Sequence, residues 1–155
     1  MTPLTDVDIK AEDPLLMKIG GFPARSTDGS AGYDVRACTA ERVVIEPGCD
    51  AVISTGFSIA IPSAEWGCFF IPRSGLGIKN GIIMGNSVGL IDSDYRGICH
   101  LSVWNRSDET FIVQPGMRVA QMVFLPVGLP NLNVVESHEG TTGRAAGGLG
   151  STGTI

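Results

Sequence analysis

Short apolar segments rich in Val, Ile and Phe recur along the chain, and Pro and Gly residues separate them at short intervals. This spacing is typical of β-strands joined by turns. No window repeats apolar residues at helical spacing over three turns. The pattern therefore predicts an almost all-β fold, as a sandwich, jelly roll or barrel. The segments are RVVI near Arg42, AVISTGFSIAI from Ala51, WGCFFI from Trp66, GIIMGN from Gly81, GICHLSVWN from Gly97, TFIV from Thr110 and RVAQMVFLPV from Arg118.

The chain length suits one domain with its own core, and we expect residues 1–155 to form it. The composition changes at Glu136, because the segment 136–155 is rich in Gly and almost lacks large apolar side chains. Such a segment contributes little to a core, so we expect a flexible C-terminal arm. An ordinary frayed terminus is the alternative reading of a Gly-rich tail considered alone.

The formal net charge of −5 argues against broad binding of nucleic acid or of an anionic membrane. Any anionic ligand must therefore be held by local groups. The eight Arg residues against three Lys suit forked contacts to phosphate or carboxylate. The first residues lack a signal-peptide pattern, and no apolar run is long enough to cross a membrane, so we expect a cytoplasmic protein.

Cysteine and histidine spacing gives no metal or triad signature. The cysteines form no CxxC pair, and we expect them to be small buried side chains that stay reduced. His100 and His138 have no carboxylate partner that the sequence reveals, and no HExxH motif is present. A tightly bound transition metal is therefore disfavoured. The cysteines are Cys38, Cys49, Cys68 and Cys99.

Two segments in the first half carry candidate polar groups. In AGYDVRA, residues 31–37, Asp34 begins a predicted strand, although a lone Asp there is usually solvated or caps a turn. In PRSGLGIKNG, residues 72–81, Arg73 and Ser74 precede a Gly-flanked turn whose amides can point at an anion. This second segment is not a Walker loop, because the GxxxxGK[ST] spacing is absent.

The segment GNSVGLIDSDYRG, residues 85–97, predicts a hairpin with an acidic tip. Asp92 follows an apolar pair, so we expect it to be partly shielded and placed to hold a water molecule. Asp94 also lies at the tip, and Tyr95 can present its ring to a sugar or a base.

Two later segments add polar residues. Arg118 and Gln121 have opposite parity in a strand, so they share a polar face only at an edge or a bulge. GRAAGGLGSTG, residues 143–153, is a Gly-rich run with one Arg. By itself it is a weak signal.

Taken together and in this order, the five segments resemble the five motifs of the trimeric dUTPase family, the deoxyuridine triphosphate nucleotidohydrolases. The resemblance spans almost the whole chain, and PRSGLG, GLIDSDYRG and RVAQ are close to complete matches. It implies a β jelly roll assembled as a homotrimer, with active sites at subunit interfaces that the C-terminal arms close. It also implies hydrolysis of dUTP to dUMP and pyrophosphate, which limits uracil incorporation into DNA and supplies dUMP for dTMP synthesis.

The resemblance assigns the reacting end of the nucleotide. Asp92 would hold and activate the water that attacks the α-phosphorus. Asp34 would meet Mg²⁺ through water, the ion arriving with the nucleotide on its three phosphates. The phosphates would be gripped by Arg73, Ser74, the Gly75 amide and Gln121, with Arg118 supporting the site or the arm.

The same resemblance assigns the base and the sugar. Tyr95 would lie under the deoxyribose and leave no space for a ribose 2′-OH, while thymine's methyl group would collide with the uracil pocket. The uracil would be read by Asn86 and by backbone groups near Gly89, Leu90, Ile91 and His100.

The last motif departs from the family pattern Arg-Gly-x-Gly-Gly-Phe-Gly. Here Arg144 is retained, but Leu149 replaces the Phe that stacks on the uracil. Three rival readings stay open: a dCTP deaminase, a non-catalytic nucleotide sensor, and a structural jelly-roll subunit. Ammonia release from dCTP would favour the first, and tight binding of dUTP without turnover would favour the second. The third would leave the polar motif residues without a purpose.

Overall fold

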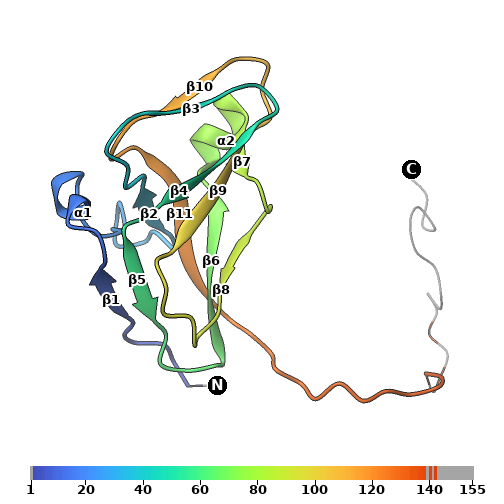
Figure 1. Cartoon of the computed structure of the whole chain (residues 1–155). Coiled ribbons are helices and arrows are strands. Elements are labelled where there is room, and N and C mark those ends of the chain that lie inside the picture. Colours follow the sequence, from blue (N-terminus) through green and yellow to red (C-terminus); the bar gives the residue numbers. More distant parts are fainter. Residues whose placement is uncertain (1, 139, 141, 143–155) are drawn as a thin grey trace.

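The computed structural model describes residues 2–138, 140 and 142, which form a β-rich body with two short helices (Figure 1). In chain order the elements are β1 (Asp8–Ala11), α1 (Leu15–Lys18), β2 (Tyr33–Arg36), β3 (Val43–Ile45), β4 (Asp50–Ser54), β5 (Phe57–Ala60), β6 (Trp66–Pro72), α2 (Ser74–Asn80), β7 (Ile82–Met84), β8 (Gly89–Ile91), β9 (His100–Asn105), β10 (Phe111–Val113) and β11 (Arg118–Pro126).

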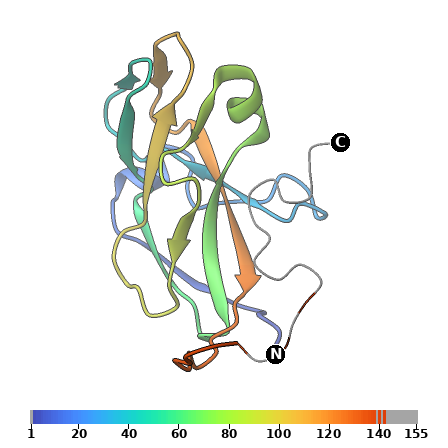
Figure 2. The same ribbon diagram turned by 90° about the vertical axis from the view of Figure 1, so that its right-hand side faces the viewer.

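The strands pair antiparallel in four sheets. The two larger sheets have the strand orders β2-β11-β6-β8 and β4-β9-β7, and the pairs β1-β5 and β10-β3 complete the body. Neighbours far apart in the sequence, such as β2 and β11, are typical of a jelly roll. Figure 2 shows β6 and β11 side by side along the molecule, with α2 at one end. This is the all-β jelly-roll architecture that the sequence predicts.

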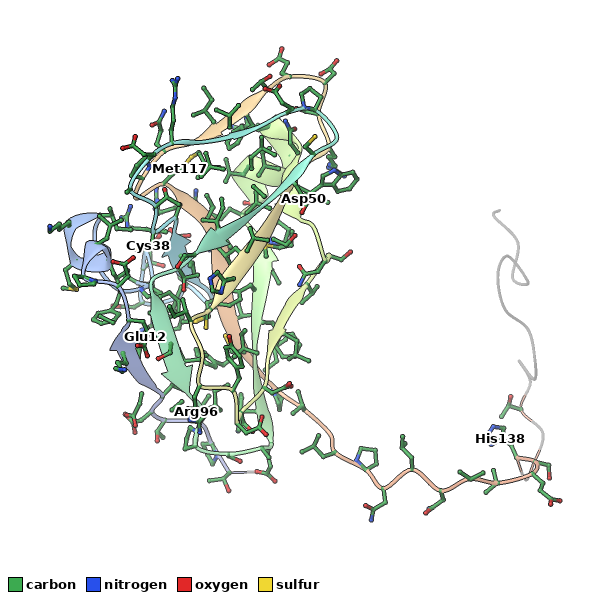
Figure 3. The ribbon with its side chains drawn as sticks, in the orientation of Figure 1. Glu12, Cys38, Asp50, Arg96, Met117 and His138 are labelled. Atoms are coloured by element: carbon green, nitrogen blue, oxygen red, sulfur yellow. The ribbon has the colours of Figure 1, made fainter. Side chains whose placement is uncertain are left out.

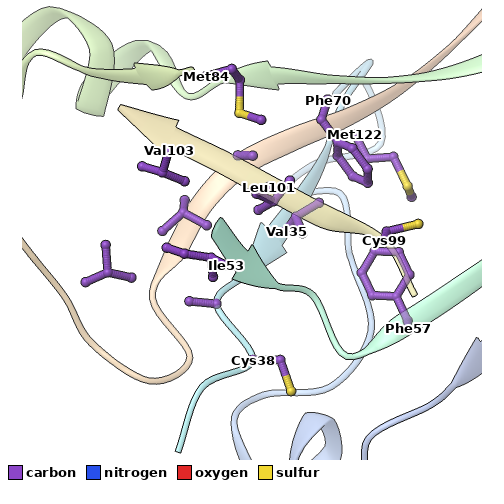
Figure 4. Packing of buried hydrophobic residues seen from close by; sticks show 14 of the residues in the cluster. Val35, Cys38, Ile53, Phe57, Phe70, Met84, Cys99, Leu101, Val103 and Met122 are labelled. Carbon is purple, nitrogen blue, oxygen red and sulfur yellow. The ribbon is translucent and has the colours of Figure 1, made fainter. Parts of the chain in front are cut away.

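The core lies between the two larger sheets (Figure 4). Phe70 and Met122 come from the four-stranded sheet, while Ile53 and Leu101 come from the three-stranded one, and all four are at most 4% exposed. Burial alternates along β9, as expected for a strand with one face in a core. The sheets thus hold their edges and ends in fixed relative positions.

The predicted apolar segments form β3 to β7 and β9 to β11. The segment from Ala51 divides into β4 and β5, because Gly56 takes a positive φ of 74° in the turn between them. The sequence missed β1, because it has only four residues and all of them are exposed. It also missed α1 and α2, which have four and seven residues and are too short to show helical periodicity.

Three cysteines are buried as expected, and burial raises the pKa of the Cys99 thiol to about 11. The expectation is wrong for Cys49, which is exposed. In the described part of the chain, no helix has the length and apolar character needed to cross a membrane. Residues 128–138 leave the end of β11 and extend away from the body (Figure 1).

Candidate functional site

A buried carboxylate joins two of the predicted segments. Asp34 in β2 is 7% exposed. Its Oδ1 accepts a hydrogen bond of 3.0 Å from Nε of Arg73, and its Oδ2 accepts one of 2.8 Å from Nη1 of Arg118. Ser26 adds a longer bond of 3.3 Å from its hydroxyl to Oδ2. Asp34 thus differs from the usual solvated Asp at a strand start, because it is buried and two guanidinium groups balance its charge.

Sheet order brings these residues together, since β11 lies between β2 and β6. The register of β11 against β2 shifts between Arg118 and Ala120. This irregularity lets Arg118 reach Asp34, while Gln121 lies directly opposite Asp34 in the same pairing. A strand irregularity of this kind is one of the two ways, an edge or a bulge, in which residues of opposite parity can share a face.

Gly32 leaves room for the Gln121 side chain. A Cβ on Gly32 would lie 3.3 Å from Cβ of Gln121 and 3.4 Å from its amide nitrogen. Contacts this close force one side chain to move. The glycine of AGYDVRA therefore serves the placement of Gln121 rather than a turn.

The phosphate-cradle segment begins a helix instead of a simple turn. Arg73 has extended backbone, and Ser74 starts α2, which ends at Gly81 with a left-handed φ of 66°. Ser74 and Gly75 are exposed, and a Cβ on Gly75 would meet nothing within 4 Å. The first amides of a helix have no intrahelical partner, so this end keeps its donors free for an anion.

The uracil-pocket candidates lie along β8 and beside β9. Asn86 is exposed in the turn before β8, and Gly85 beside it donates its backbone N–H to Ser102 of β9 over 2.8 Å. His100 is exposed at the start of β9, and its Nδ1 lies 3.0 Å from the Ile98 carbonyl oxygen. Gly89 is buried, whereas Leu90 is 54% exposed and Ile91 is half-buried.

The loop after β8 carries Asp92, the candidate that would hold the water, and Tyr95, the candidate that would contact the sugar. Asp92 is exposed, so the predicted shielding does not exist within a single chain. Tyr95 is 41% exposed, and its hydroxyl donates to the Ile98 carbonyl over 3.0 Å. The expected simple hairpin is wrong, because β8 pairs with β6 while β7 pairs with β9.

We call the set of Asp34, Arg73, Arg118 and Gln121 the phosphate-side group. This group and Asp92 lie at opposite ends of β6. Arg73 follows the last residue of β6, whereas the register places Ile91 opposite Cys68 near its start. At about 3.3 Å per residue, Asp92 is roughly 20 Å from Arg73. Figure 1 shows this separation, with α2 at the top and the loop after β8 at the bottom. One chain therefore does not bring its own Asp92 to its own Arg73.

No cluster of three or more His, Cys, Asp or Glu side chains that could hold a metal ion occurs among the described residues. Both Asp34 oxygens already accept from guanidinium groups, and an ionised carboxylate has about four acceptor positions. This geometry suits a contact through water better than direct coordination. The predicted arm residues Arg144 and Leu149 lie outside the described residues.

Sequence reasoning missed three residues that the structure places beside Asp34 or in the loop of Tyr95. Ser26 bonds to Asp34, and Arg96 and Gly97 contact the loop of Tyr95. The motif DYRG contained the last two, but their roles depend on how the loop folds back on itself. No local pattern marks Ser26, because it lies eight residues from its partner.

The pKa of Asp34 supports the ion-pair geometry. Burial by itself raises this pKa, but the hydrogen bonds and charges of Arg73 and Arg118 outweigh burial, so the pKa lies below its ordinary value. The folded state thus binds this proton less readily than the unfolded state. The resulting stability is present above the unfolded pKa of about 3.9 and is lost as the pH falls through the folded value.

Asp34→Asn is expected to lower the free energy of unfolding at pH 7 by roughly 1–3 kcal/mol, because it leaves Arg73 unpaired; the exposure of Arg118 limits the loss. The difference from wild type should shrink as the pH falls to about 3. Urea unfolding at both pH values measures it. The exposed Asp94→Asn is the control, and a difference independent of pH would contradict the ion-pair interpretation.

Comparison with known sequences gives one consistent family. The chain matches the dUTPase family model over residues 20–153. A deoxyuridine 5'-triphosphate nucleotidohydrolase of Shigella flexneri serotype 5b is 46% identical over 95% of this chain and 97% of its own length. One of Escherichia coli O9:H4 is 46% identical over the same shares.

Solved structures agree with the sequence relatives. A dUTPase of Staphylococcus bacteriophage 80alpha with dUPNHPP has a TM-score of 0.84 at 26% identity, covering 96% of this chain and 99% of that chain. A mutant dUTPase of phage phi11 of S. aureus, described with a structural Mg(II) ion, shares the fold with a TM-score of 0.76 at 23% identity, over 88% of this chain and 100% of that chain. Since family model, relatives and fold agree over nearly the whole chain, this protein belongs to the dUTPase family.

Proposed function

We propose that this protein hydrolyses dUTP to dUMP and pyrophosphate by in-line attack of water on the α-phosphorus. The observation that carries the proposal is the meeting of Asp34, Arg73, Arg118 and Gln121 at one end of the four-stranded sheet. These residues come from three of the ordered motifs. The reaction limits uracil incorporation into DNA and supplies dUMP for dTMP synthesis.

The phosphate side of the site would use groups that already converge. Arg73 keeps guanidinium donors beyond the one given to Asp34, and Ser74 and the Gly75 amide are exposed beside it. Gln121 would contact the α-phosphate region from the neighbouring strand. Arg118 would support this side, because it shares Asp34 with Arg73.

The base and sugar side would select deoxyuridine. Asn86, with backbone groups near Gly89, Leu90, Ile91 and His100, would present a base-pairing edge to uracil and exclude thymine's methyl group. The half-exposed ring of Tyr95 would lie under the deoxyribose. Because the ring would leave no space for a ribose 2′-OH, the site would reject UTP.

Asp92 would hold the attacking water. A carboxylate is a weak base near neutral pH, so orientation of the water would contribute more than proton abstraction. Mg²⁺ would enter on the triphosphate, with Asp34 contacting it through water. The ion would neutralise phosphate charge and help to align the triphosphate.

The decisive measurement is pyrophosphate release from dUTP, dTTP, dCTP and UTP, with and without Mg²⁺. We expect Mg²⁺-dependent turnover of dUTP alone. Asp92→Asn should lower kcat by about 10²–10⁴-fold, since the amide cannot hold and activate the water as the carboxylate does. Asp94→Asn, an exposed carboxylate in the same loop, is the matched control. Tight dUTP binding without turnover by the wild type would instead support a sensor.

We also propose a homotrimer with shared sites, in which the geometry supports the sharing and the number of chains rests on the resemblance to the trimeric dUTPase family. Because Asp92 and Arg73 lie roughly 20 Å apart at opposite ends of β6, a complete site needs Asp92 from one chain and the phosphate-side group from another. A closed ring of identical chains supplies such head-to-tail pairs. The arm, residues 136–155, would then close over a neighbour's site.

Mixing two inactive variants tests the shared site. Asp92→Asn and Ser74→Ala chains, co-refolded in equal amounts, should recover up to about a quarter of wild-type activity, because a quarter of the interfaces then pair two intact halves. Sedimentation of the same samples should show trimers. Activity no higher than the mean of the two parents, or a monomer, would contradict shared sites.

Leu149→Phe should lower the KM for dUTP by about 5-fold. The aromatic face would stack on uracil where Leu only covers it, a gain of about 1 kcal/mol. Steady-state kinetics measure the change, with Met17→Phe as control at an exposed position of α1 outside the arm. An unchanged or higher KM for the arm variant would mean that the arm closes in another way.

A further inference from the structure

We propose that Arg96 and Gly97 are positioning residues that set sugar selectivity by fixing the ring of Tyr95. The inference rests on the proposed function, in which Tyr95 lies under the deoxyribose. It concerns how firmly the ring is held. A ring that can yield by about 1 Å gives space to a 2′-OH, whereas a ring held from behind does not.

Gly97 forms the backing of the ring. A Cβ on Gly97 would meet the Tyr95 hydroxyl oxygen and Cζ (2.7 Å), distances that real Cβ atoms do not show. The ring therefore lies directly across the Gly97 backbone. Gly97 is not among the glycines with a left-handed φ, so its absent side chain serves the ring and not the turn.

Hydrogen bonds fix the ring in this place. The Tyr95 hydroxyl donates to the Ile98 carbonyl over 3.0 Å, one residue beyond Gly97. The Tyr95 backbone N–H donates to the Asp92 carbonyl over 3.2 Å. The position of the ring is thus coupled to the position of Asp92 in the same loop.

Arg96 stabilises the backbone of the same loop through its guanidinium group. Its Nη1 donates to the carbonyls of Ser93 over 2.7 Å and Tyr95 over 2.8 Å. Bonds from a charged donor are stronger than neutral ones and hold the turn shape. Figure 3 shows Arg96 at the end of the body opposite Met117. Arg96 therefore acts on the loop that carries Tyr95 and Asp92, and not on the ion pairs of Asp34.

Gly97→Ala displaces the ring from the Gly97 backbone and breaks its hydrogen bond to the Ile98 carbonyl, so the ring is no longer held from behind and can yield to a 2′-OH. We expect the ratio of kcat/KM for dUTP to kcat/KM for UTP to fall by about 10-fold or more, chiefly through a lower KM for UTP. Gly29→Ala is the matched control, because a Cβ there meets nothing within 4 Å and its φ is not left-handed. Thermal unfolding of both variants separates loss of selectivity from loss of fold.

Arg96→Gln provides the second variant. It removes the two carbonyl bonds at an exposed position and should lower the same ratio several-fold without a change in Tm. A folded Gly97→Ala with wild-type selectivity would overturn the proposal. If Gly97→Ala does not fold, Arg96→Gln decides in the same way. Absence of dUTP turnover in the wild type would refute the proposed function instead.

Discussion

The carboxylate of Asp34 is the interaction on which the phosphate side depends. An unpaired buried charge is costly, and Arg73 and Arg118 offset that cost from two different strand ends. In return the carboxylate holds both guanidinium groups in fixed orientations. Each guanidinium group keeps further donors, and because its orientation is already ordered, the proposed binding of a triphosphate would cost little additional ordering.

The local sequence pattern predicted most of the strands, because the apolar residues of a strand mark the positions that are buried. The partners of Asp34 were not predictable, since they depend on the order β2-β11-β6 and on a register shift between Arg118 and Ala120. Parity allowed Arg118 and Gln121 to share a face at an edge or at a bulge, and the outcome depends on pairing between strands more than 80 residues apart. The short helix α2 was hidden for another reason, because seven residues with two glycines carry no periodic signal.

The motif residues were found individually, yet their distribution over two ends of β6 was not. Sequence order brings Arg73 and Asp92 within 19 positions, which suggests proximity, whereas the antiparallel return of β8 carries Asp92 away from Arg73. The same fact explains why Asp92 is exposed instead of shielded. In the proposed shared site, a neighbouring chain would supply both the shield and the phosphate ligands for this carboxylate.

The segment after β11 points to the same conclusion from packing alone. Leu129, Leu132, Val134 and Val135 are 58–102% exposed in the single chain, and none of them packs in its core. Burying a side chain of this size contributes about 1.5–3 kcal/mol, so an extended apolar strip of this kind gains most by lying on another surface. Such a strip leads directly into the arm. Docking it on a neighbour would therefore also set how far the residues beyond position 136 can reach, which links assembly of the chains to closure of the site.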